Sequence, residues 1–175
     1  MNKDSFEKKL GEQYVFMNRD KLLQICPEST FARWGVEINS GWYLILERAC
    51  QRISSALEEY SLPQETFLLL QCKQKWGSYR MYWRLDDESY TPIVDGADNG
   101  SVYFNNYSSL VKKEIKSIID EAAQEASHTC EFCGAVDDSV CLCQDSWVYI
   151  LCQNCQQKRI QMISERKKNR QKPQL

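Results

Sequence analysis

Residues 128–155 read HTCEFCGAVDDSVCLCQDSWVYILCQNC, and the cysteines at the two ends of this stretch decide how the C-terminal part of the chain folds. Cys130 and Cys133 form one C-x-x-C pair, Cys152 and Cys155 form another, and 18 residues separate the pairs. Each pair can present two thiolates to one ion, and this spacing is typical of a zinc site. Four sulfur ligands fill the tetrahedral shell of Zn²⁺ and leave no position for a substrate water. The pattern therefore predicts a structural zinc site.

The residues around these ligands predict a treble-clef-like zinc finger over 128–170. Gly134 follows the first pair and allows the tight turn of a zinc knuckle. Residues 147–151 are apolar and predict a short strand, and the second pair then opens a helix. Thiols at a helix N-terminus have a lowered pKa, which favours metal binding.

Three further residues in or beside this module can interact with a metal ion. Cys141 and Cys143 could be alternative ligands, a second incomplete site, or thiols on a hairpin strand. Their C-x-C spacing differs from that of a knuckle, so we expect strand thiols. His128 could replace a ligand or hydrogen-bond to a thiolate, although a cation at a helix end is the commoner role for such a residue.

Upstream of the finger, the sequence predicts an α+β body over 1–127. Residues 41–60 and 108–127 have apolar side chains at spacings of 3–4, which is typical of amphipathic helices. Ser40 is a candidate N-cap for the first of them. Between these helices, residues 66–85 alternate as two strands and predict an antiparallel hairpin. We therefore expect a small antiparallel sheet packed by two amphipathic helices.

The predicted hairpin turns at Gly77 and has two different faces. One face is apolar, and the other mixes cations with aromatic rings. The candidate partner-binding residues on that second face and turn are Lys73, Lys75, Trp76, Arg80, Tyr82 and Arg84. Such a set can dock a protein, contact nucleic acid, or form only a solvated face. Residues 86–100 predict a loop, and 101–104 a third strand.

The charge of the chain is unevenly distributed. The net charge is −2, yet residues 156–175 contain seven Lys or Arg and one acid, so the remainder has 15 basic and 23 acidic residues. An acidic body suits a basic partner, since opposite potentials steer association. The basic end is a candidate for phosphate contacts, through Lys158, Arg159, Arg166, Lys167, Lys168 and Arg170. Residues 171–175 predict a tail.

The sequence offers few groups for catalysis, and we expect no enzyme. It has a single histidine and no Gly-rich phosphate loop or metalloprotease motif. Cys26, Cys50 and Cys72 lie among apolar residues and predict buried thiols. The charged N-terminus lacks a signal sequence, and no apolar run could span a membrane. Nine cysteines used as ligands and core thiols fit a reducing cytoplasm.

Three motifs follow one another along the chain: Ser40-Gly41-Trp42-Tyr43, then Lys73-x-Lys75-Trp76-Gly77-x-Tyr79-Arg80-x-Tyr82, then the four-cysteine finger. From about residue 40 to 155 the chain resembles a group of uncharacterised small bacterial and phage-borne proteins. Those proteins share a Gly-Trp helix start, a K-x-K-[FW]-G-x-[LY]-R-x-Y strand and a terminal zinc finger. Some look like accessory genes of mobile elements, so the resemblance implies counter-defence or toxin neutralisation.

From these observations together we expect a cytoplasmic, non-enzymatic protein that occludes a macromolecular partner, as an inhibitor or immunity-type protein does. A basic toxin or a host defence protein is the expected partner. The alternative is a zinc finger protein that binds nucleic acid through its basic C-terminal helix.

Overall fold

The computed structural model describes residues 2–86, 100–145 and 147–170, and their side chains except those of 100–108 and 167–170. In the body the elements are α1 (Lys3–Gln13), η1 (Val15–Met17), α2 (Arg19–Ile25), α3 (Thr30–Trp34), η2 (Ser40–Trp42), α4 (Tyr43–Glu59), η3 (Gln64–Thr66), β1 (Phe67–Lys75), β2 (Ser78–Leu85) and α5 (Gly100–Ser127). In the C-terminal module they are β3 (Cys141–Gln144), β4 (Val148–Leu151) and α6 (Gln153–Arg170). The fold is α+β, as the sequence predicts.

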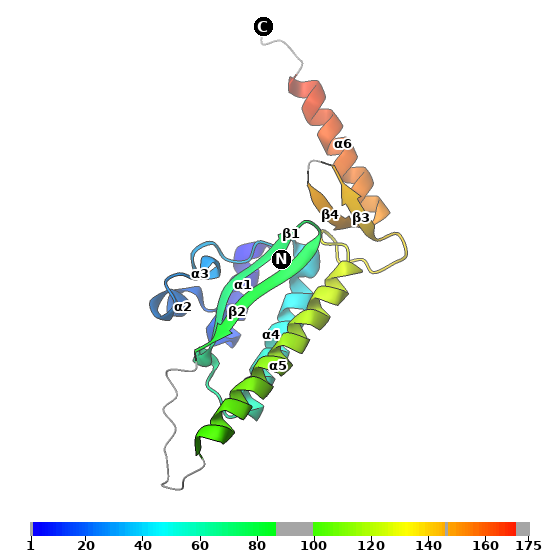
Figure 1. The fold of residues 1–175 in the computed structure, drawn as a ribbon. Helices are drawn as coiled ribbons and strands as arrows, with labels where there is room; N and C mark the ends of the chain where they lie inside the picture. The colour runs from blue at the N-terminus through cyan, green and yellow to red at the C-terminus, as the bar shows by residue number, and fades with distance from the viewer. Residues whose placement is uncertain (1, 87–99, 146, 171–175) are drawn as a thin grey trace.

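The two long helices of the body, α4 and α5, lie side by side (Figure 1). Their apolar stripes belong to the main core. On the solvent side Arg48 pairs with Glu125, and Arg52 lies 2.7 Å from Glu121. Exposed pairs of this kind contribute about 0–1 kcal/mol each, so burial of the stripes is the main source of stability. The predicted stripe residues within the two helices are buried, and they include Leu46, Cys50, Ile53, Val111, Ile115 and Ile118. Tyr60, predicted to end the first stripe, follows α4 and is half-buried.

Strands β1 and β2 form the predicted antiparallel hairpin, with Cys72 opposite Met81 and a bulge at Leu70. Trp76 and Gly77 make the two-residue turn, and their φ angles are 54° and 72°. Positive φ at both positions is the type I′ geometry that matches the twist of a hairpin. Helix α3 packs along β1 and α5 along β2, so the hairpin lies between the N-terminal helices and the α4–α5 pair (Figure 1).

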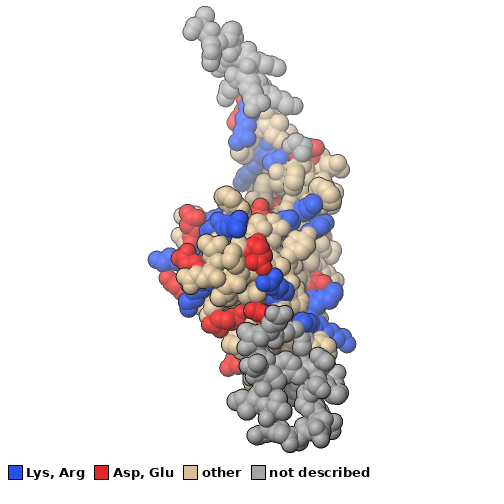
Figure 2. All heavy atoms as spheres, turned by 60° about the vertical axis from the view of Figure 1, so that its left-hand side comes forward, with Lys and Arg blue, Asp and Glu red and all other residues tan. Residues whose placement is uncertain are grey.

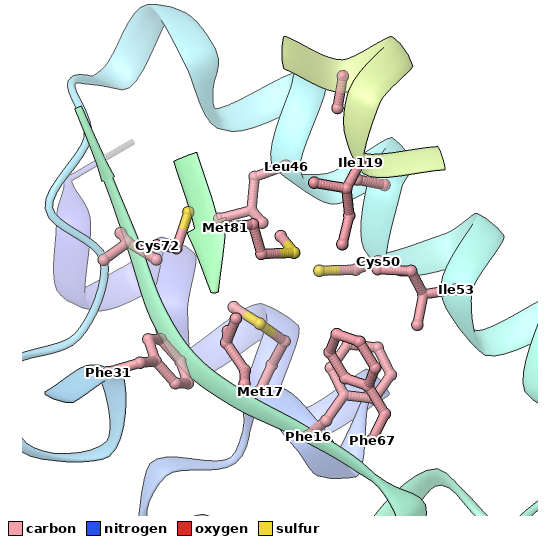
Figure 3. Close-up of a cluster of buried hydrophobic side chains, with 14 of the residues drawn as sticks. Phe16, Met17, Phe31, Leu46, Cys50, Ile53, Phe67, Cys72, Met81 and Ile119 are labelled. Carbon is pink, nitrogen blue, oxygen red and sulfur yellow. The ribbon is translucent and has the colours of Figure 1, made fainter. Parts of the chain in front are cut away.

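The main core fills the space between the hairpin and the helices (Figure 3). Met17 from η1, Cys50 from α4 and Met81 from β2 are among the buried side chains that meet there. The predicted burial of Cys26, Cys50 and Cys72 is confirmed. Burial raises the pKa of Cys72 to about 12, so this side chain is a neutral thiol at physiological pH.

Two local predictions are wrong. Residues 101–104 lie in helix α5, and the described part of the chain contains two sheets of two strands each. Extending an existing helix adds a hydrogen bond for each residue, whereas a four-residue strand would need its own pairing. Ser40 does not cap α4; its hydroxyl donates to the carbonyl of Phe132 at 3.2 Å. The predicted loop at 86–100 falls almost entirely outside the described residues.

The C-terminal module consists of a turn at 130–134, the antiparallel hairpin β3–β4 and helix α6. This order of knuckle, hairpin and ligand-bearing helix is the predicted treble-clef-like arrangement. Helix α6 extends away from the body (Figure 1). Within the described residues, no helix combines the length and the apolar character that crossing a bilayer requires.

Candidate metal centre and its contact with the hairpin

The structure brings the four predicted ligand cysteines together. Cys130 and Cys133 come from the turn before β3, while Cys152 and Cys155 come from the start of α6, and the four sulfur atoms lie within 4.8 Å of one another. The Sγ atoms of Cys133 and Cys152 are 3.6 Å apart. His128 is exposed at the end of α5 and is not part of this group. Four thiols in this arrangement can hold one metal ion.

The backbone of the turn directs its amides toward sulfur. The N–H of Gly134 donates to the carbonyl of Cys130 at 2.8 Å, and Gly134 has φ 78°, which a residue with a side chain rarely adopts. Burial tends to raise the pKa of the Cys130 thiol, but hydrogen bonds from backbone N–H groups, first that of Cys152, outweigh it and lower the pKa. These hydrogen bonds favour the metal-binding thiolate form at Cys130. Burial raises the pKa of the Cys133 and Cys155 thiols, so the lowered pKa expected at the start of the helix is not found at Cys155.

The Gly-Trp motif is the joint between the body and the finger. The N–H of Gly41 donates to the carbonyl of Glu131 at 2.9 Å. A Cβ atom at Gly41 would lie 2.2 Å from the carbonyl oxygen of Cys130, so only glycine allows this approach. The next residue, Trp42, is fully buried, and its Nε1 donates to the carbonyl of Thr129 at 2.8 Å. The helix start predicted from sequence thus contacts the turn that carries Cys130 and Cys133 and the residue just before it.

Glu131, between Cys130 and Cys133, also stabilises the contact between the body and the finger, through a buried carboxylate. Its Oε1 accepts from the N–H of Ile150 at 2.9 Å, and its Oε2 accepts from Asn39 Nδ2 at 2.7 Å. Burial raises the pKa of Glu131, and these hydrogen bonds offset part of that rise. Gln74 on β1 adds another hydrogen bond between the body and the finger, because its Oε1 accepts from Trp147 Nε1 at 2.8 Å. Sequence reasoning missed both Glu131 and Gln74; the available signal was a lone acid inside an apolar knuckle.

Five of the six predicted partner-binding residues gather at the tip of the hairpin, and we call Lys73, Lys75, Trp76, Arg80 and Tyr82 the tip cluster. Lys75 Nζ lies 4.6 Å from the centre of the Trp76 ring, and the Arg80 guanidinium lies 6.0 Å from it. Lys73 Nζ lies 5.4 Å from the Tyr82 ring. A hydrogen bond from Arg80 lowers the pKa of Tyr82, and the nearby positive charges act in the same direction.

The sixth residue, Arg84, lies apart from the tip cluster and pairs with Glu28 at 2.7 Å. On the face shown in Figure 2, Lys and Arg are interspersed with Asp and Glu over the body. The body therefore shows no single sign of charge on this face.

The turn of the hairpin rests on the finger. A Cβ atom at Gly77 would lie 3.3 Å from Val148 Cγ1 and 3.4 Å from Leu142 Cδ1. Three large apolar side chains stay exposed where the two hairpins meet: Trp76 at 58%, Leu142 at 59% and Trp147 at 45%. We call these three residues the seam. With Lys75 and Arg80 over the Trp76 ring, the seam has an apolar centre beside cations.

Of the basic residues predicted to contact nucleic acid, Arg159 makes contacts within the finger, while Lys158 and Arg166 are exposed to solvent. The Arg159 guanidinium pairs with Asp145 at 2.7 Å and lies 4.2 Å from the centre of the Tyr149 ring, so it stabilises the finger itself. Lys158 and Arg166 are exposed on α6. The side chains of Lys167, Lys168 and Arg170 lie outside the described part of the chain.

The chain matches no protein-family model, no curated protein sequence and no solved structure. Its geometry offers two chemical features. One is a set of four thiols that can hold a metal ion, and the other is the exposed seam with its neighbouring cations.

Proposed function

We propose that this chain is a non-enzymatic, zinc-containing binding protein that occludes the surface of a protein partner, as inhibitors and immunity proteins do. The observation that carries the proposal is Trp76, a large aromatic residue that is both strained and 58% exposed. The zinc module supplies the rigid support, and the seam with the tip cluster supplies the contact surface.

Zinc is the metal that suits the four thiols best. Two thiolates on one tetrahedral Zn²⁺, with Zn–S bonds of about 2.3 Å, lie roughly 3.8 Å apart, and the Cys133–Cys152 sulfur distance is 3.6 Å. Four sulfurs complete the coordination shell, which suits a structural role. When bound, zinc would hold the knuckle to the start of α6. Binding in zinc-finger peptides is worth about 10–16 kcal/mol, enough to fold a module with a small core.

The conformation of Trp76 favours a binding role. The left-handed region costs a residue with a side chain about 1–2 kcal/mol, and the first turn position of a type I′ hairpin prefers Asn or Gly. The Trp76 ring gains little burial in return, since it is mostly exposed. Strained residues that persist on a surface cluster at functional sites. Trp and Arg are also the residues most enriched where binding energy concentrates in protein interfaces.

The charges beside the seam indicate the kind of surface that docks there. Lys73, Lys75 and Arg80 surround the aromatic rings of the tip cluster. A partner that inserts an apolar group against Trp76 and places carboxylates around it would complement both features. The basic partner expected from the acidic body would have to bind elsewhere, and it stays a prediction.

Capture from a nuclease-treated lysate, with the purified zinc-loaded chain as bait, tests the proposal. We expect Trp76→Ala or Arg80→Ala to remove a specific protein that the unmodified chain retains. Trp34→Ala is the matched control, because Trp34 is 68% exposed on α3, away from the seam. A retained set that Trp76→Ala does not change would contradict the proposal. Capture that nuclease removes, and that Lys158→Ala with Arg166→Ala weakens, would favour the nucleic-acid alternative.

A further inference from the structure

Cys141 and Cys143 form a second pair of thiols on the finger. Both lie on β3, their Sγ atoms are 3.7 Å apart, and Cys141 is exposed while Cys143 is half-buried. The four-cysteine group does not include them. That group already has the number of sulfurs that one tetrahedral ion requires, so the pair is free of a role there.

The strand geometry points both thiols the same way. Successive side chains of a strand alternate between its faces, so residues 141 and 143 share one face and Leu142 takes the other. Leu142 lies against the turn at Gly77. The two thiols therefore lie on the face of β3 that is turned away from the hairpin tip. Because β3 pairs with β4 along its whole length, their spacing is held by the sheet.

A direct disulfide is a poor outcome for this pair. Cys141 and Cys143 are two residues apart on an extended strand, so their Cα atoms are separated by about 6.7 Å. Disulfides have Cα separations of about 4.4–6.8 Å, with most near 5.5–6 Å, so a disulfide here would lie at the upper end of the range and away from the favoured geometry. An atom inserted between the sulfurs removes this conflict, because the two sulfurs then do not have to approach to the S–S bond length of about 2.05 Å. The observed separation of 3.7 Å is ordinary contact between two thiols, so both sulfurs can reach one bound atom with only small side-chain movements.

We propose that Cys141 and Cys143 form a second binding site, which binds a soft, thiophilic species through two sulfur ligands. Two sources share this chemistry: a monovalent soft ion such as Cu(I), and a mono-substituted trivalent arsenical. Soft thiolate ligands select such species over hard cations. An ordered strand that presents both thiols together also lowers the entropic cost of closing the chelate.

The reaction with an arsenical balances without any redox change. An aryl arsenic(III) oxide condenses with the two thiols: two As–S bonds form, the arsenic–oxygen bond is lost, and both thiol protons leave with the oxygen as one water. With Cu(I), the two sulfurs bind the ion and their protons pass to solvent. Neither route involves the sulfurs of the four-cysteine group.

The test uses the full chain loaded with zinc and phenylarsine oxide as the probe, with adducts counted by intact mass and zinc release followed by a zinc indicator. We expect one adduct per chain with the zinc retained. Replacing either thiol, as in Cys141→Ser or Cys143→Ser, should weaken binding about 100-fold, because a chelate becomes a single attachment. Cys26→Ala, which removes a buried lone thiol, is the control and should bind as the unmodified chain does.

A second arm supplies Cu(I) under anaerobic conditions, buffered by a competing chelator. Uptake by the unmodified chain with zinc retained, and its loss in Cys141→Ser, assigns the site to soft ions as well as to arsenicals. Uptake of phenylarsine oxide alone restricts the site to arsenicals. Adducts that persist in Cys141→Ser and Cys143→Ser, or binding of either probe that releases zinc in equal amount, would overturn the proposal.

Discussion

Replacing Gly41 by alanine should separate the finger from the body. The added Cβ atom would lie 2.2 Å from the carbonyl oxygen of Cys130 and 2.7 Å from the carbonyl carbon of Glu131. Both neighbours are backbone atoms of the turn at 130–134, so no side chain can rotate away to relieve the overlap. The start of α4 would have to move, and the hydrogen bonds from Gly41 and Trp42 to this turn would lengthen.

The loss of stability has two sources, the steric overlap and the weakened hydrogen bonds. Overpacking of a well-packed site costs about 1–3 kcal/mol, and a weakened hydrogen bond costs about 1 kcal/mol more. We therefore expect Gly41→Ala to lower the free energy of unfolding by about 3 kcal/mol. For a chain of this length, each kcal/mol lowers Tm by about 2–4 °C, which gives a fall of about 6–12 °C.

The assay is thermal unfolding followed by circular dichroism at a fixed zinc concentration, because bound metal stabilises the folded state. Gly11→Ala in α1 is the matched control, since its added Cβ atom would lie 3.2 Å from the carbonyl of Met17 and needs only a small adjustment. A Tm for Gly41→Ala that equals the Tm of Gly11→Ala would refute the idea that close backbone contact joins the finger to the body.

Three other substitutions test separate parts of the structure. Glu131→Gln should lower the free energy of unfolding by about 1–3 kcal/mol in chemical denaturation, because an amide has one acceptor oxygen where the carboxylate uses two. Unchanged stability would contradict the idea that the Glu131 carboxylate stabilises the contact between finger and body. Trp76→Asn places the preferred Asn-Gly pair in the turn, so thermal unfolding should show equal or higher stability, and a clear loss would mean that the Trp76 ring supports the fold. In elemental analysis we expect one zinc per chain for the unmodified chain and for Cys141→Ser, and none for Cys152→Ser. Equal zinc content in the two variants would contradict the assigned ligand set.

Features that depend on short segments could be predicted from the sequence. The β1–β2 hairpin has alternating side chains on both sides of Gly77, and strand register follows from that alternation and the turn. The stripes of α4 and α5 likewise repeat within single helices. The third strand at 101–104 was wrong because a four-residue segment has no decisive period of its own. The sequence also indicated the cations and aromatic rings of the tip cluster, but not that Arg84 lies apart with Glu28.

By itself, the sequence determined the four-cysteine group, the hairpin and the two amphipathic helices, because spacing and periodicity act over a few residues. Only the tertiary structure decided how the finger sits on the body. Asn39 and Glu131 are 92 residues apart and Trp42 and Thr129 are 87 apart, yet each pair is hydrogen-bonded. Such contacts depend on how whole elements pack, and no local pattern encodes them. The same packing placed the turn at Gly77 against Val148 and Leu142 of the second hairpin.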